Sequence, residues 1–283
     1  MTDPEETRES GAKDAASVKT PAKTGPKRAI HGPVIERVGP GVSADRRTLL
    51  VLPGLGGGKA GLVALLDGLA RTRPVLSIET DSFSGSWPSR VAAILAELDR
   101  RGLERVDVLA WSFGGVVAQH ALLAAPQRFE GVILAATAAR LRARERAMMA
   151  HLRALFEHDL EPMALARALI GVLFGPPFLR RPGVVAVLEA LLGQVPLDRA
   201  NWIGAFDALL EHRLERELRG TDKVRAVLCG ELDWIFPIDE AERLAELVGA
   251  PLERLPGIGH ALWIEAPQAM IAACERHLGP PSL

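Results

Sequence analysis

Short apolar runs recur along most of the chain, and longer segments with helical spacing of apolar residues separate them. Runs of this kind, rich in β-branched and aliphatic residues, are typical of strands buried on both faces. They lie at 34–38, 49–52, 75–78, 106–109, 132–135, 224–228 and 252–255. Because helical patterns lie between most of them, the sequence predicts an α/β fold with a mainly parallel central sheet and helices on both faces.

One interval interrupts this alternation. Residues 138–219 have only helical patterns, divided into roughly four or five segments by proline-containing breaks. The breaks are Glu161-Pro162, Gly175-Pro176-Pro177, Arg181-Pro182 and Val195-Pro196. We expect this insertion to fold over the carboxyl ends of the strands as a helical cap. The expected organisation is a polar, disordered tail at 1–30, a core at 31–137 and 220–283, and the cap at 138–219.

The composition agrees with a globular protein. The chain has 283 residues, of which 48% are hydrophobic, and a formal net charge of -1. Such a charge gives no bulk attraction to nucleic acid or to membranes. Because the apolar runs are too short to span a bilayer and the N-terminus lacks an apolar signal segment, we expect a cytoplasmic protein. Cys229 and Cys274 are expected to be buried apolar residues rather than a disulfide.

The run at 106–109 ends in a pattern that carries chemistry. Residues 110–114 read Ala110-Trp111-Ser112-Phe113-Gly114, a small-x-Ser-x-Gly turn before an alanine-rich helix. A serine on a sharp strand-to-helix turn leaves room only for very small residues two positions before and after it, which Ala110 and Gly114 provide. The pattern therefore predicts a nucleophile elbow at Ser112, although a simple helix cap is the alternative.

Two further polar residues follow later strands. Asp233 lies in the loop after the run at 224–228, and His260 lies in the glycine-bounded loop after the run at 252–255. A serine hydroxyl is a weak nucleophile unless a base such as His260 accepts its proton, and an acid such as Asp233 orients that base. Asp233 as a helix cap and His260 as an ordinary loop histidine are the alternatives. The order Ser, Asp, His favours a triad, with Glu231 as the alternative acid.

With these three motifs, residues 33–279 resemble the α/β-hydrolases of the capped esterase and lipase-like group. The resemblance implies a serine hydrolase that acts on a carboxylic ester, thioester or lactone without cofactor or metal. It also implies that an oxyanion hole is formed by two main-chain amides. By position these belong to Leu55, in the glycine-rich loop after the run at 49–52, and to Phe113, which follows the nucleophile.

Large apolar side chains near these motifs are candidates for an acyl pocket. In the core they are Trp111 and Trp263, and in the insertion they are Phe174, Phe178, Trp202 and Phe206. The insertion also contains Phe156, Met163, Leu169 and Leu173 as weaker candidates. Most of these residues are individually expected to pack the cap on the core rather than to line a pocket.

Other functions remain open from the sequence. A similar triad serves acyltransferases and carbon–carbon bond hydrolases, and the fold also occurs in binding proteins without activity. Gly56-x-Gly58-x-x-Gly61, with Glu79 or Asp81 about twenty residues later, matches a Rossmann dinucleotide fingerprint. A Rossmann oxidoreductase would leave the contexts of Ser112, Asp233 and His260 as three coincidences, so we favour the hydrolase.

The start of the insertion is basic. Arginines stand at 140, 142, 144, 146 and 153, and could attract an anionic substrate or a carrier protein. We favour a solvated helix face for this run. His151 and His158 lie seven residues apart without a third ligand nearby, so we expect no metal site. The expected partner is a small-molecule ester.

Overall fold

The computed structural model describes residues 34–40, 42, 46–56, 59–80, 85–158, 160–193 and 198–279. Several features singled out from the sequence lie outside the described residues. They are the expected disordered tail, Gly58, Asp81 and the break at Val195-Pro196.

Seven strands form one sheet in the order β1-β3-β2-β4-β5-β6-β7. β1 is antiparallel to β3, and every other neighbouring pair is parallel, which confirms the mainly parallel sheet. β4, β5 and β6 extend beyond the predicted apolar runs. β5 begins before its run, whereas β4 and β6 continue past the ends of theirs. The strand bounds are β1 (Val34–Arg37), β2 (Leu49–Leu52), β3 (Val75–Ile78), β4 (Val106–Trp111), β5 (Phe129–Ala135), β6 (Val224–Gly230) and β7 (Leu252–Leu255).

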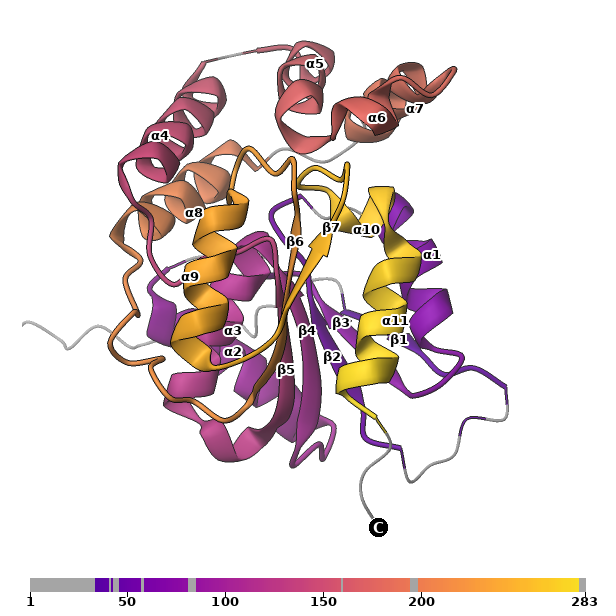
Figure 1. The fold of residues 1–283 in the computed structure, drawn as a ribbon, viewed down its shortest axis with the longest axis vertical. Helices are drawn as coiled ribbons and strands as arrows, with labels where there is room; N and C mark the ends of the chain where they lie inside the picture. Colours follow the sequence, from indigo (N-terminus) through magenta and orange to yellow (C-terminus); the bar gives the residue numbers. More distant parts are fainter. Residues whose placement is uncertain are drawn as a thin grey trace, which may run out of the picture.

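Helices cover both faces of the sheet (Figure 1). One face carries α2 (Trp87–Arg100), α3 (Ser112–Ala124) and α9 (Ile238–Val248), and the short 3₁₀ helix η2 (Pro126–Arg128) follows α3. The other face carries α1 (Lys59–Leu69), α10 (Leu262–Glu265) and α11 (Pro267–His277). Cys229 and Cys274 are both buried and unbridged. No helix in the described part of the chain is long and apolar enough to cross a membrane.

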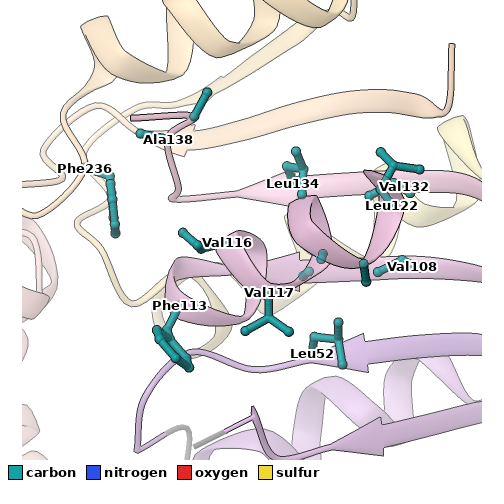
Figure 2. Close-up of a cluster of buried hydrophobic side chains, with 14 of the residues drawn as sticks. Leu52, Val108, Phe113, Val116, Val117, Leu122, Val132, Leu134, Ala138 and Phe236 are labelled. Carbon is teal, nitrogen blue, oxygen red and sulfur yellow. The ribbon is translucent and has the colours of Figure 1, made fainter. Parts of the chain in front are cut away.

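Packing between α3 and the sheet fixes the position of the elbow (Figure 2). Val116, Val117 and Leu122 of α3 are buried against side chains of three strands. These strand residues are Leu52 of β2, Val108 of β4, and Val132 and Leu134 of β5. Because α3 is apolar on nearly all sides and buried along most of its length, the turn between β4 and α3 is held by the core on both sides.

The interval at 138–219 contains five helices in the described residues. They are α4 (Ala143–Glu157), α5 (Pro162–Leu173), α6 (Pro176–Leu179), α7 (Val184–Leu192) and α8 (Arg199–Glu211). α5 and α6 begin at the expected prolines, since a proline in the first turn of a helix removes no intrahelical hydrogen bond. Figure 1 shows α5, α6 and α7 at the top of the molecule, beyond one end of the sheet.

Candidate active site

Ser112 stands at the junction of β4 and α3 in a strained backbone conformation. Its φ is 54°, a value that residues other than glycine rarely adopt. A methyl group on Gly114 would lie 2.1 Å from the carbonyl oxygen of Leu52, so this position tolerates only glycine. Ala110 is fully buried in β4, where it pairs with Leu52 and Leu134. The local structure is therefore the sharp strand-to-helix turn that the small-x-Ser-x-Gly pattern predicts.

The three predicted polar residues meet at the carboxyl ends of the strands. His260 Nε2 lies 2.9 Å from Ser112 Oγ, and His260 Nδ1 lies 2.9 Å from Asp233 Oδ2. With Nδ1–H donating to the Asp233 carboxylate, Nε2 presents its lone pair to the Ser112 hydroxyl. This arrangement allows the imidazole to accept the serine proton while the carboxylate stabilises the resulting positive charge.

Asp233 is held by its own loop. Its Oδ1 accepts hydrogen bonds from the main-chain amides of Ile235 at 2.8 Å and Phe236 at 2.9 Å. The side chain is buried, and these amides satisfy the oxygen that does not face His260. Glu231, the alternative acid, is exposed, and Asp233 makes the hydrogen bond to the ring.

The glycine-rich loop after β2 lies directly against Ser112. A methyl group on Gly54 would come within 2.8 Å of Ser112 Cβ and 3.2 Å of its Oγ. Leu55, the next residue, lines the cavity above Ser112. Phe113 lies in the first turn of α3, where a main-chain amide has no intrahelical acceptor. The loop that contains Leu55 and the start of α3 therefore both lie beside Ser112, and the oxyanion role of the Leu55 and Phe113 amides stays a prediction.

An apolar cavity opens above Ser112 and His260. Its walls come from α4, α5, α7 and α8 of the insertion and from the core loops after β2, β6 and β7. Of the predicted pocket residues, Trp202, Phe206 and Trp263 line it, as do the weaker candidates Phe156, Leu169 and Leu173. Other apolar lining residues were not predicted from the sequence, among them Met149, Leu152, Leu165, Leu192, Leu209, Ile235 and Phe236. The signal was present on α4 and α5, since Met149, Leu152 and Phe156, like Leu165, Leu169 and Leu173, recur at helical spacing.

Three predicted pocket residues do not line this cavity. Trp111 is fully buried beside Trp263, with ring centroids 5.7 Å apart. Successive side chains of a strand point to opposite faces, and the Trp111 side chain points into the core and not into the cavity. Phe174 and Phe178 pack against each other at 5.7 Å in the same core cluster as Trp111. These three residues therefore pack the core. Met163 is also absent from the lining and is partly exposed.

The arginines at the start of the insertion contact other residues of the same chain. Arg140 and Arg142 form ion pairs with Glu215, and Arg153 pairs with Asp207 and Glu157. The Arg146 guanidinium donates to the carbonyl of Leu210, and the Arg144 guanidinium lies 5.7 Å from the centre of the Trp234 ring. These contacts tie the insertion to itself and to the core.

A second buried carboxylate, which sequence analysis did not identify, lies beside the His260 loop. Glu265 ends α10, and its two oxygens accept the main-chain amides of Gly175 and Gly259, each at 3.0 Å. Burial raises the pKa of the Glu265 carboxyl above its usual range. The two amide hydrogen bonds and the nearby His260 oppose this effect, and the Asp233 charge adds to it. The signal available in the sequence was an acidic residue five positions after His260.

The order of the parallel strands separates this fold from the dinucleotide-binding alternative. If β1 is set aside and the six parallel strands β2 to β7 are renumbered 1 to 6 in chain order, their order across the sheet is 2-1-3-4-5-6. The Rossmann order is 3-2-1-4-5-6. Gly56, which belongs to the apparent fingerprint, packs instead against the Trp202 ring of α8, where an added methyl group would lie 2.4 Å from the ring.

Two curated proteins are similar to this chain over most of its length. The chain is 28% identical over 241 residues to the biotin biosynthesis bifunctional protein BioHC of Cellvibrio japonicus, covering 81% of this chain and 47% of that one. It is 28% identical over 209 residues to the polyketide synthase ThaQ of Burkholderia thailandensis, covering 70% of this chain and 9% of that one. This chain thus spans about half the length of the first relative and a small part of the second.

Among solved structures, a hydrolase from Pseudomonas aeruginosa superposes with a TM-score of 0.74 at 26% identity. The match covers 87% of this chain and 94% of that chain. A model of the alpha/beta hydrolase family matches residues 30–273. Because that match spans most of the chain, the protein belongs to the alpha/beta hydrolase family.

Proposed function

We propose that the protein is a serine hydrolase that cleaves a carboxylic ester, thioester or lactone through an acyl-enzyme on Ser112. One observation carries this proposal. Ser112, His260 and Asp233 are joined by two successive hydrogen bonds of 2.9 Å at the floor of an apolar cavity. A hydroxyl, a base and an orienting acid in this geometry are the groups that acyl transfer requires.

In the first half of the reaction, Ser112 Oγ attacks the substrate carbonyl carbon while its proton passes to His260 Nε2. The carbonyl oxygen becomes an oxyanion, which the main-chain amides of Leu55 and Phe113 stabilise. The tetrahedral intermediate then collapses. His260 returns the proton to the leaving alcohol or thiol, and the acyl group remains on Ser112.

In the second half, water takes the place of the leaving group. His260 Nε2 accepts a proton from the water as its oxygen attacks the acyl carbon, and a second tetrahedral intermediate forms. When this intermediate collapses, Ser112 Oγ leaves and recovers the proton from His260. The product is a carboxylic acid, and the protein is restored without cofactor or metal.

The substrate class follows from the cavity. Apart from the groups around Ser112 and His260, its lining is made of apolar side chains such as Leu165, Phe206 and Phe236. A lining of this kind favours an apolar acyl group of small to medium size. Because α4, α5, α7 and α8 contribute walls, we propose that residues 138–219 act as the cap that sets acyl preference.

The test uses a fluorophosphonate probe and p-nitrophenyl esters of acetyl, butyryl and octanoyl acids. We expect covalent labelling at Ser112 and hydrolysis of at least one ester, with one ¹⁸O atom from labelled water in the acid product. An acyltransferase would instead move the acyl group to an added alcohol. A binding protein without activity would neither label nor turn over.

The matched control is Ser112→Ala, which removes only the nucleophilic oxygen. It should unfold at the same temperature as the wild type, fail to label, and lose about 10⁴-fold or more in turnover. If this variant retains more than about a tenth of wild-type turnover, Ser112 is not the nucleophile.

A further inference from the structure

Glu265 is a buried carboxylate that takes no part in the hydrogen bonds between Ser112, His260 and Asp233. Only 7% of its surface is exposed. Burying a carboxylate is costly unless hydrogen bonds compensate for the lost water. Here each oxygen accepts one main-chain amide, from Gly175 at 3.0 Å and from Gly259 at 3.0 Å. The buried carboxylate thus connects two backbone segments through its two hydrogen bonds.

These two segments have different origins. Gly259 directly precedes His260 in the loop after β7, and Gly175 lies in the insertion between α5 and α6. A third hydrogen bond joins the same segments, because the amide of Ala261 donates to the carbonyl of Leu173 at 2.9 Å. His260 is therefore flanked on both sides by residues whose amides are bonded, directly or through Glu265, to the end of α5.

The contact is close enough to require glycine on both sides. A methyl group on Gly175 would lie 2.6 Å from the carbonyl oxygen of Gly257, and one on Gly259 would lie 2.5 Å from the amide nitrogen of Gly175. Neither glycine has a positive φ, so close approach rather than backbone conformation explains both residues. The insertion and the His260 loop are thus in direct main-chain contact at this point.

Glu265 does not replace Asp233 as the acid. His260 Nδ1 is already bonded to Asp233 Oδ2 at 2.9 Å, and both Glu265 oxygens face amides.

We propose that Glu265 is a positioning residue that locks the His260 loop to the Leu173–Gly175 segment of the insertion, so that correct placement of the imidazole depends on the docked helical cap. This inference rests on the proposed hydrolase function. It adds that the cap does more than line the cavity. Leu173 and His260 both line that cavity. The hydrogen bonds through Glu265 therefore connect a wall of the acyl site to the histidine that accepts the Ser112 proton.

The decisive variant is Glu265→Gln. A glutamine has nearly the same shape, but it offers one acceptor oxygen and an NH₂ group that cannot accept from an amide N–H. One of the two amides, of Gly175 or Gly259, therefore loses its partner. Gly175→Ala is the second variant, because it leaves the Glu265 side chain in place but adds a methyl group that would lie 2.6 Å from the carbonyl oxygen of Gly257 and 3.1 Å from Glu265 Oε2, which pushes the segments apart. Glu240→Gln is the matched control, since Glu240 is also a buried carboxylate but pairs with Arg142 and Arg243 away from the His260 loop.

Two measurements on the full-length protein test the proposal. The first is kcat and KM for p-nitrophenyl butyrate, counted per site titrated with fluorophosphonate. Glu265→Gln and Gly175→Ala should lower kcat by about 10- to 100-fold with KM changed less than about threefold, because misplacing a base by a fraction of an ångström affects the reaction more than binding. The second is the downfield NMR signal of the His260 Nδ1 proton, which should broaden in both variants and stay sharp in Glu240→Gln.

The outcomes separate this inference from the proposed function. A lower melting temperature with wild-type kcat per titrated site and a sharp His260 signal would make Glu265 a purely structural residue and overturn the inference. If the wild type neither labels nor hydrolyses esters, the hydrolase proposal fails. The NMR signal still decides whether Glu265 positions His260 in that case.

Discussion

Gly54 and Ser112 are in such close contact that a single methyl group on Gly54 would lie 2.8 Å from the Ser112 Cβ. The contact brings the loop after β2, with the predicted oxyanion donor Leu55, against the nucleophile. Two sharp turns from different parts of the chain thus form one site, and each turn depends on a residue with almost no side chain.

The first prediction follows from this contact. Gly54→Ala should displace the loop from Ser112 and lower ester hydrolysis by about 100-fold, because the oxyanion donors would no longer be aimed at the reacting oxygen. Gly204→Ala is the control. A methyl group there meets no neighbouring atom, and alanine favours a helix such as α8, so stability should be unchanged or slightly higher. Equal activity in both variants would show that the loop does not form the oxyanion hole.

The second prediction concerns the acid. Asp233→Asn should keep the fold and cost on the order of 10⁴ in turnover, because an amide can hold His260 in the wrong tautomer. Glu231→Gln, two residues away and exposed, should change turnover by less than about twofold. Steady-state kinetics with p-nitrophenyl butyrate separates the two. A loss below about tenfold for Asp233→Asn would mean that another group orients the histidine.

The third prediction concerns the cavity. Phe206→Ala and Leu165→Ala remove part of the cavity wall and so enlarge the cavity. Both should shift the preference toward longer acyl chains, because each additional methylene accommodated stabilises the bound acyl group by about 1 kcal/mol. Phe178→Ala is the matched control, because Phe178 packs on Phe174 outside the cavity. It should lower the melting temperature and leave the ratio of octanoyl to acetyl rates unchanged. If the ratio of octanoyl to acetyl rates is the same in all three variants, the cap does not set the acyl-chain preference.

The fourth prediction concerns acid stability. His120 of α3 and His212, at the end of α8, lie with ring nitrogens 3.3 Å apart, and His212 Nε2 donates to the carbonyl of Ala138. Burial lowers the pKa of both histidines from the ordinary 6.5 to about 4. As the pH falls from about 6.5 to 4, the unfolded chain therefore takes up protons that the folded protein does not, and the free energy of unfolding decreases. For the buried His212 the loss is on the order of 3 kcal/mol by pH 4.

Urea unfolding at pH 7.5 and pH 5 measures this loss. His212→Gln should lose less stability than the wild type between the two pH values, although it starts lower because the histidine contacts are gone. His151→Gln, on the exposed surface of α4, is the control and should follow the wild type. An equally steep decrease in His212→Gln would show that other groups cause the acid sensitivity.

The alternation of short apolar runs with helical patterns determined the α/β fold and the place of the helical insertion. The same sequence pointed to Ser112, Asp233 and His260 as site residues because each lies in a local turn pattern at the end of a strand. Turn geometry depends on a few neighbouring residues, and the ends of parallel strands meet at one edge of a sheet. Residues far apart in the chain could therefore be grouped without knowledge of the packing.

The tertiary structure alone decided which side chains line the cavity and what Glu265 does. Trp111 and Phe178 have the same large apolar character as Trp202 and Phe206, yet the first two pack the core and the last two line the cavity. Glu265 contacts Gly175, which lies 90 positions earlier in the chain. A large apolar side chain is equally hydrophobic whether it faces a cavity or the core, and only the packing of distant elements determines which of the two it meets.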